Sequence, residues 1–91
     1  MFAQDKTPTD DLGNVSDDFQ VHFFEALKQK GIENYELALN ALDKAQVTAK
    51  DNQENKAVVY FEKGKNLTAL KRFEEAERNY NLVLEWSPEK L

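Results

Sequence analysis

The chain carries one pattern of apolar residues twice, in two segments that lie 38 positions apart. Each copy has an aromatic residue, an alanine three positions later, a large apolar residue four further on and a small apolar residue three beyond that. The copies are Tyr35, Ala38, Leu42 and Ala45, and then Phe73, Ala76, Tyr80 and Val83. A period of roughly 20–50 residues is typical of proteins built from stacked similar units. The pattern therefore predicts a repeat array and directs the functional question to its surfaces.

Composition narrows the class of protein further. The 91 residues are enough for one domain, and 41% hydrophobic with 32% charged residues favours a folded chain over a disordered one. The net charge of -5, with lysine and arginine dispersed among the acids, argues against binding to nucleic acid or to anionic membranes. The sequence has no cysteine and no apolar run near the roughly 20 residues that cross a bilayer.

Apolar spacing predicts four amphipathic helices joined by short turns, an all-α fold of two antiparallel hairpins. The expected helices cover about 17–30, 34–49, 54–70 and 73–86. Ser16 is the expected N-cap of the first helix, and Gly31 its left-handed C-cap. The turn formers Ser87 and Pro88 are expected to stop the last helix.

The N-terminal segment is expected to form a separate part of the chain. Residues 1–15 are predicted to be a flexible lead, and residues 16–91 the domain, with repeat one at about 17–52 and repeat two at about 54–90. The sequence around Ala3-Gln4 resembles the end of a secretory signal peptide as found in bacteria of the Bacteroidetes type. That interpretation implies a periplasmic or secreted protein. The alternative is an ordinary disordered N-terminus on a cytoplasmic one.

Gly64 lies inside the third expected helix, where glycine costs about 1 kcal/mol relative to alanine. Such a cost suggests a packing reason for the missing side chain. The sequence therefore predicts that another helix crosses at Gly64 with no room for a Cβ atom.

The second copy resembles a tetratricopeptide repeat over residues 60–88. Its first helix has an aromatic residue, a small residue four positions later and a large apolar residue three further on: Tyr60, Gly64 and Leu67. Its second helix has the family's order of aromatic, alanine, aromatic, small residue and proline: Phe73, Ala76, Tyr80, Val83 and Pro88.

The first copy, about residues 19–51, is similar in its second helix, but the alignment of its first helix stays open. Counting back without gaps places Ala26 at the small position and His22 at the aromatic one. A short insertion near Gly31 would instead bring Phe23 or Phe24 to the aromatic position.

The resemblance implies a short right-handed α-solenoid whose concave face is made mostly by the first helix of each repeat. It also implies a protein that binds a peptide or another protein, without catalysis and without a cofactor or metal. The concave-face candidates in the second copy are Val58, Phe61, Lys65, Thr68 and Ala69. Those in the first copy are Gln20, Phe23 and Leu27. Phe61 is either an exposed anchor for a ligand or a residue that packs on the first repeat.

Catalytic chemistry has little support in the sequence. His22 is the only histidine, and Asp18, four residues before it, is its one candidate partner on the same helix face. A single imidazole makes neither a metal site nor an acid–base pair by itself. We therefore interpret His22 as structural and expect no enzyme activity.

Two hairpins alone leave an end of the array uncovered, because about three units are normally needed for stability. Three explanations are open. The chain is part of a longer array, or it forms a homodimer through the last helix that covers Leu82 and Trp86, or its N-terminal segment folds back as a cover. Self-assembly is therefore the alternative function to ligand binding.

Overall fold

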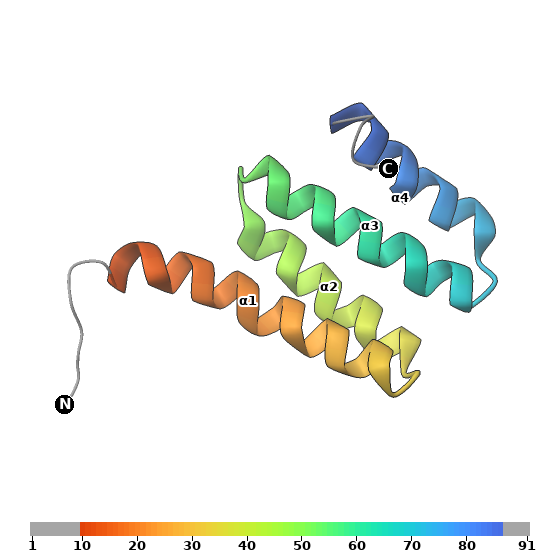
Figure 1. The fold of residues 1–91 in the computed structure, drawn as a ribbon, viewed down its shortest axis with the longest axis horizontal. Coiled ribbons are helices and arrows are strands. Elements are labelled where there is room, and N and C mark those ends of the chain that lie inside the picture. Colours follow the sequence, from red (N-terminus) through yellow and green to blue (C-terminus); the bar gives the residue numbers. More distant parts are fainter. Residues whose placement is uncertain (1–9, 87–91) are drawn as a thin grey trace.

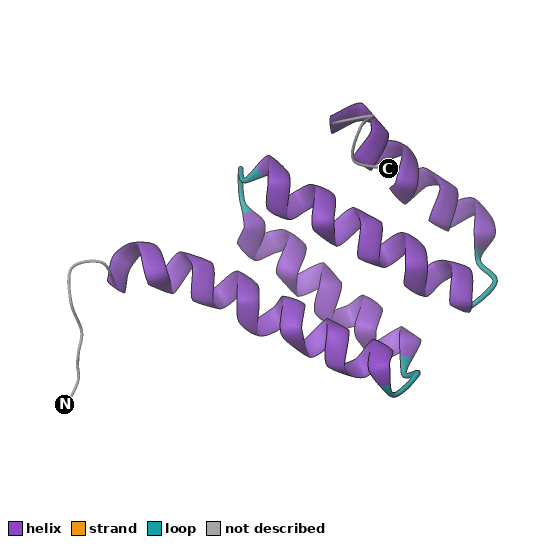
Figure 2. Cartoon of the chain, in the orientation of Figure 1, coloured by secondary structure: helices purple, strands orange, loops and turns teal. Residues whose placement is uncertain are grey.

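The computed structural model describes residues 10–86, with side chains from Asp18 onward. Within this range the chain forms four helices and no strand: α1 (Asp10–Gly31), α2 (Tyr35–Ala49), α3 (Gln53–Ala69) and α4 (Phe73–Trp86). The helices run back and forth, so α1 and α3 point one way and α2 and α4 the other (Figures 1 and 2). The prediction of an all-α fold made of antiparallel helices is confirmed.

The expected start of the first helix at residue 17 is wrong. α1 already begins at Asp10, so Ser16 lies inside the helix rather than at its N-cap, and residues 10–15 of the expected flexible lead are helical. Residues 1–9, with the signal-peptide resemblance, and residues 87–91, with the predicted stop at Ser87-Pro88, lie outside the described range.

The end of α1 also differs from the prediction. No glycine of the described chain has a positive φ, so Gly31 is not a left-handed cap; that conformation falls on Glu33, with φ 65°. The amide of Glu33 donates to the Lys30 carbonyl at 2.9 Å, and the amide of Asn34 donates to the Gln29 carbonyl at 2.8 Å. These two bonds make a Schellman motif in which Glu33 occupies the position that glycine usually takes.

The turn between α3 and α4 repeats this geometry 38 residues later. Lys71 has φ 63°. Its amide donates to the Thr68 carbonyl at 2.9 Å, and the Arg72 amide donates to the Leu67 carbonyl at 2.8 Å. Because every donor and acceptor is shifted by the same 38 positions, the two hairpins align without a gap. Ala26 therefore corresponds to Gly64, and His22 to Tyr60, which decides the open alignment of the first helix.

Each helix packs mainly on the next one along the chain, in the order α1 on α2, α2 on α3 and α3 on α4. The main core cluster lies where α1, α2 and α3 meet, with Leu42 and Val59 fully buried in it. Most of the buried apolar residues in the described chain are alanines, which let the helices approach closely. The alanines are Ala26, Ala38, Ala41, Ala45, Ala49, Ala57 and Ala76.

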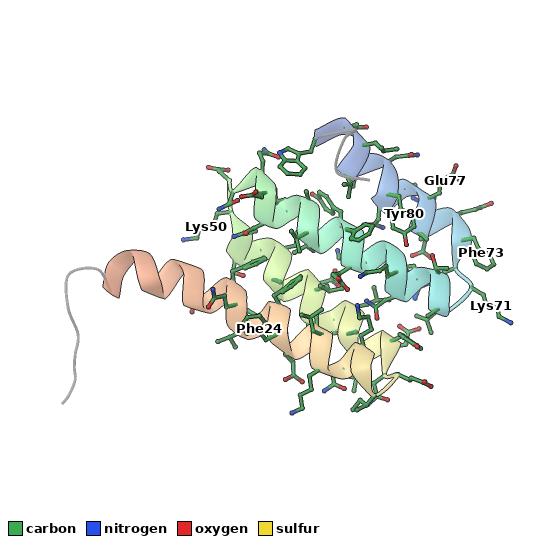
Figure 3. All side chains as sticks on the ribbon, viewed as in Figure 1. Phe24, Lys50, Lys71, Phe73, Glu77 and Tyr80 are labelled. Atoms are coloured by element: carbon green, nitrogen blue, oxygen red, sulfur yellow. The ribbon has the colours of Figure 1, made fainter. Side chains whose placement is uncertain are left out.

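Gly64 meets the helix that the sequence predicts there. A Cβ atom built on Gly64 would lie 2.6 Å from Cζ and 2.7 Å from Cδ1 of Tyr80, and it would also overlap Cε1. Tyr80 belongs to α4, and its ring lies between α3 and α4 (Figure 3). The missing side chain of Gly64 is therefore the space that the Tyr80 ring occupies.

The turn between α2 and α3 joins the two hairpins. Lys50 adopts φ 54° and ψ -120°, and Asn52 caps α3 by accepting a hydrogen bond from the Asn55 amide at 2.9 Å. Farther along the same interface, Lys63 of α3 bonds to both Asp43 and Gln46 of α2, each at 2.7 Å. These contacts fix the second hairpin on the first.

Candidate functional site

The candidate binding face lies along α1 and α3, which run in the same direction (Figure 1). One ion pair joins the two helices directly, because Lys30 Nζ lies 2.7 Å from Glu62 Oε1. A second lysine, Lys65, approaches the other oxygen of Glu62 at 2.9 Å. The face is thus organised around a carboxylate held between two ammonium groups.

Glu62 is a buried charge, with 8% of its surface exposed. Burial by itself would raise the pKa of this carboxyl group, but the hydrogen bonds from Lys30 and Lys65 outweigh it and hold the pKa below the ordinary value. The hydrogen bond that Lys65 donates to Glu62 raises the pKa of Lys65. Glu62 and Lys65 are therefore charged together near neutral pH.

Phe61 and Lys65 are the two predicted site residues that the structure brings into contact. Lys65 Nζ lies 4.9 Å from the centre of the Phe61 ring, within the range of a cation–π interaction. Phe61 also contacts Tyr80: the two ring centres lie 5.8 Å apart, and the two ring planes are tilted by 56° relative to each other. Phe61 remains exposed, and the ring it contacts belongs to Tyr80 in α4 of its own hairpin.

The other α3 candidates continue this strip of surface. Val58 is exposed one turn before Phe61. Thr68 is exposed, but its hydroxyl group donates a hydrogen bond to the Gly64 carbonyl at 2.8 Å. The hydroxyl hydrogen is therefore already used within α3. Ala69 is exposed as the last residue of α3.

The α1 candidates lie at the edge of the core. The Phe23 ring stacks on Phe19 with centres 5.4 Å apart and packs on the main core cluster, so only part of it faces outward. Leu27 is half-buried, whereas Gln20 is exposed. Gln20 and Phe23 also line a cleft of about 330 Å³ where α1 passes the N-terminal end of α3, with Phe19, Phe24, Asn52 and Asn55.

His22 is half-buried on another side of α1, in a shallow depression shared with Glu25, Leu37 and Lys44. Both His22 and Asp18 belong to the described part of the chain, and no hydrogen bond or ion pair joins them there. Across residues 18–86 no three metal-ligating side chains gather into a cluster. Among the described helices none has both the length and the apolar character to span a bilayer.

Two features of this candidate face were not predicted from the sequence. Glu62 had no signal of its own, because a single glutamate in a charged helix is normally a surface residue. Lys30 of α1 is its main partner from 32 positions earlier, and the packing of the helices brings the two together. The second feature is Asn52, which lines the cleft beside Gln20 and Phe23. Its role as the N-cap of α3 could have been predicted from the sequence, because asparagine is a typical residue at that position.

Comparisons with descriptions of protein families, with curated proteins and with solved structures gave no match to this chain. The geometry of the face is therefore the basis for a functional proposal.

Proposed function

We propose that the chain is a non-catalytic interaction module of the tetratricopeptide-repeat kind, which binds a peptide or a helix on the face formed by α1 and α3. The observation that carries the proposal is the strip on α3 in which exposed Val58 and Phe61 adjoin the Lys65 ammonium group. An exposed aromatic ring beside a charged group is a common form of binding hot spot.

The charge of the face favours a particular kind of ligand. Glu62 neutralises only one of its two lysines, and Lys65 keeps donors that Glu62 does not use. An apolar side chain of the ligand would contact Phe61 and Val58, and an acidic group beside it would contact Lys65. We therefore expect peptides that combine an apolar anchor with a neighbouring carboxylate.

The preorganised position of Phe61 supports the same role. Its ring is held by Tyr80 on one side and by Lys65 on another, so binding would order few additional side chains. Low ordering entropy is what lets a small groove bind a peptide with useful affinity.

Selection from a random peptide library would test the proposal. Peptides with the expected apolar and acidic pattern should be enriched, and Phe61→Ala should weaken their binding at least about tenfold. Val58→Ser should weaken binding, whereas Val47→Ser, which alters an exposed valine on α2, should not. No enrichment, or equal binding by all variants, would remove the proposal.

A further inference from the structure

The gapless alignment of the two hairpins allows each residue to be compared with its counterpart 38 positions away. Val59 of α3 is 0% exposed, because it packs into the core cluster with α1 and α2. Its counterpart on α1 is also a valine, Val21, and this one is 63% exposed. The difference is one of place in the stack: α3 has a hairpin before it, and α1 has none within the described chain.

At the other end of the stack, residues of α4 are likewise more exposed than their counterparts on α2. Leu42 of α2 is 0% exposed, and Gln46 bonds to Lys63 of α3. Their counterparts on α4 are Tyr80, which is half-buried, and Leu84, which is 40% exposed. The half-buried Tyr35 corresponds to Phe73, which is 60% exposed.

These residues define two end faces. The α1 end face consists of Val21 and Phe24, whose counterparts on α3, Val59 and Glu62, contact the first hairpin. The α4 end face consists of Phe73, Tyr80 and Leu84, which correspond to residues of α2. The α1 end face therefore matches the α3 side of the α2–α3 interface, and the α4 end face matches the α2 side. The two end faces lie at opposite ends of one chain.

We propose that copies of this chain associate head to tail, with the α1 end face of one copy on the α4 end face of the next. The contact between copies then continues the α2–α3 interface in the same alignment. It is heterologous, because the two surfaces differ, so each copy retains one free end of each kind and association can extend beyond a dimer.

Two polar contacts of the α2–α3 interface, Lys63 with Asp43 and Arg72 with Glu36, have compatible counterparts in this arrangement, whereas a third, Lys63 with Gln46, becomes Glu25 beside Leu84, where no hydrogen bond can form. In the contact between copies, Glu25 of one copy takes the position of Lys63, and Asn81 of the other takes the position of Asp43. The Asn81 amide can donate a hydrogen bond to the Glu25 carboxylate. The ion pair of Arg72 with Glu36 becomes Asn34 beside Glu74, which again can pair in that way. No like charges replace an ion pair at these positions.

The electrostatic support between copies is nevertheless weaker than within the chain, since no ion pair carries over. Each copy also has a net charge of -5, so copies repel one another at low ionic strength. Raising the ionic strength from about 0.01 M to about 0.15 M shortens the screening length from about 30 Å to about 8 Å. Association driven by the end faces should therefore strengthen with salt.

Analytical ultracentrifugation over a range of concentration and salt would test the inference. The wild-type protein should gain mass with both. Val21→Glu on one end face, or Leu84→Glu on the other, should each weaken association at least about tenfold, because a carboxylate at residue 21 would enter an apolar contact and one at residue 84 would lie beside Glu25 of the next copy. Phe73→Glu serves as a second variant of the α4 end face, and circular dichroism verifies that each variant is helical.

Two matched controls locate the contact. Val47→Glu makes the same substitution on α2 at a valine that is 76% exposed and belongs to neither end face. Leu82→Glu alters a leucine of α4 as exposed as Leu84, but two residues away and hence on another side of the helix. Both controls should associate like the wild type.

A mixture of the two disrupted variants distinguishes head-to-tail contact from symmetric contact. Val21→Glu retains an intact α4 end face and Leu84→Glu an intact α1 end face, so the mixture should form one-to-one dimers and nothing larger. A wild-type protein that stays monomeric in salt would overturn the inference. So would equal effects of Leu82→Glu and Leu84→Glu, or a Val21→Glu protein that dimerises by itself. Val58→Ser, at an exposed residue that belongs to neither end face, should leave association unchanged, so the peptide-binding proposal stands or fails separately.

Discussion

The ring of Tyr80 fills the space that a side chain at Gly64 would need, so two residues on neighbouring helices share one volume. The counterpart pair in the first hairpin is Ala26 and Leu42, both fully or almost fully buried. A small residue against a large one is thus the packing rule of both hairpins, with the sizes adjusted to one another.

Gly64→Ala should lower the free energy of unfolding by about 1–3 kcal/mol, because the new methyl group overlaps the Tyr80 ring. The free-energy cost of the overlap should exceed the gain of about 1 kcal/mol that alanine brings in helix propensity, so the net effect is a loss of stability. Gly31→Ala is the control, since a Cβ there has no neighbour within 4 Å, and it should be neutral or stabilising. Urea unfolding measures both. A Tyr80→Leu background should reduce the effect of Gly64→Ala, and strictly additive losses would contradict the shared volume.

Glu62→Gln should destabilise the protein by about 1–3 kcal/mol, because it leaves the Lys30 and Lys65 ammonium groups without their carboxylate partner. Glu75→Gln removes a carboxylate that is bonded to Arg72 at 2.8 Å on the exposed surface. Solvent screens that pair, so the control should show no measurable change. A Glu62→Gln protein as stable as the wild type would show that the buried carboxylate contributes nothing.

The stability of the wild-type protein should depend on pH through the same carboxylate. The folded-state pKa of Glu62 lies below its ordinary value of 4.5, so its contribution is complete above that pH and is lost as the pH falls through the lower folded-state value. The pKa of Lys65 is raised above its ordinary 10.5, so its contribution is complete below that pH and is lost as the pH rises through the higher value. Unfolding midpoints of wild type and Glu62→Gln should converge at low pH. Parallel curves would refute the assignment.

Glycine at the two Schellman positions should stabilise the fold. Glu33 and Lys71 have positive φ angles, a conformation that costs an ordinary residue about 1 kcal/mol and glycine almost nothing. Glu33→Gly and Lys71→Gly should therefore raise the melting temperature by similar amounts and combine additively, because the positions are equivalent and distant. Lys44→Gly, on the exposed side inside α2, should lower stability by about 1 kcal/mol. Opposite signs at residues 33 and 71 would contradict the equivalence of the hairpins.

Much of the fold followed from the sequence because its signals are local. Apolar spacing placed α2, α3 and α4 within a residue of their observed ends, and an otherwise costly glycine predicted a closely packed helix at Gly64, which is α4. The start of α1 was missed because Ser16 followed by two aspartates is a typical cap sequence, and because turn-forming Gly13 and Asn14 precede it. The gapless alignment needed the backbone bonds of two turns, which no side-chain pattern specifies.

The candidate face was less accessible to sequence reasoning. Positions on α3 could be assigned by helical spacing, so exposed Val58 and Phe61 and half-buried Lys65 were all named in advance. The buried charge of Glu62 depends on a lysine from another helix, and the half-buried state of Phe23 depends on its stacking with Phe19. Such contacts join residues through packing between helices, which periodicity along one helix does not determine. Whether a ligand binds there stays a prediction.

The matching turns at Glu33 and Lys71 have a consequence for lengthening the molecule. Inserting a second copy of residues 34–71 directly after Lys71 would create a junction with the same backbone geometry at both of its ends. The product would have six helices in three hairpins, in which the α2–α3 contact and the α3–α4 hairpin recur and only the middle hairpin, α3 with a second α2, is a new pairing. A gene for such a protein needs one in-frame duplication of a 38-codon segment, which makes growth by whole units an accessible step for evolution and for protein engineering alike.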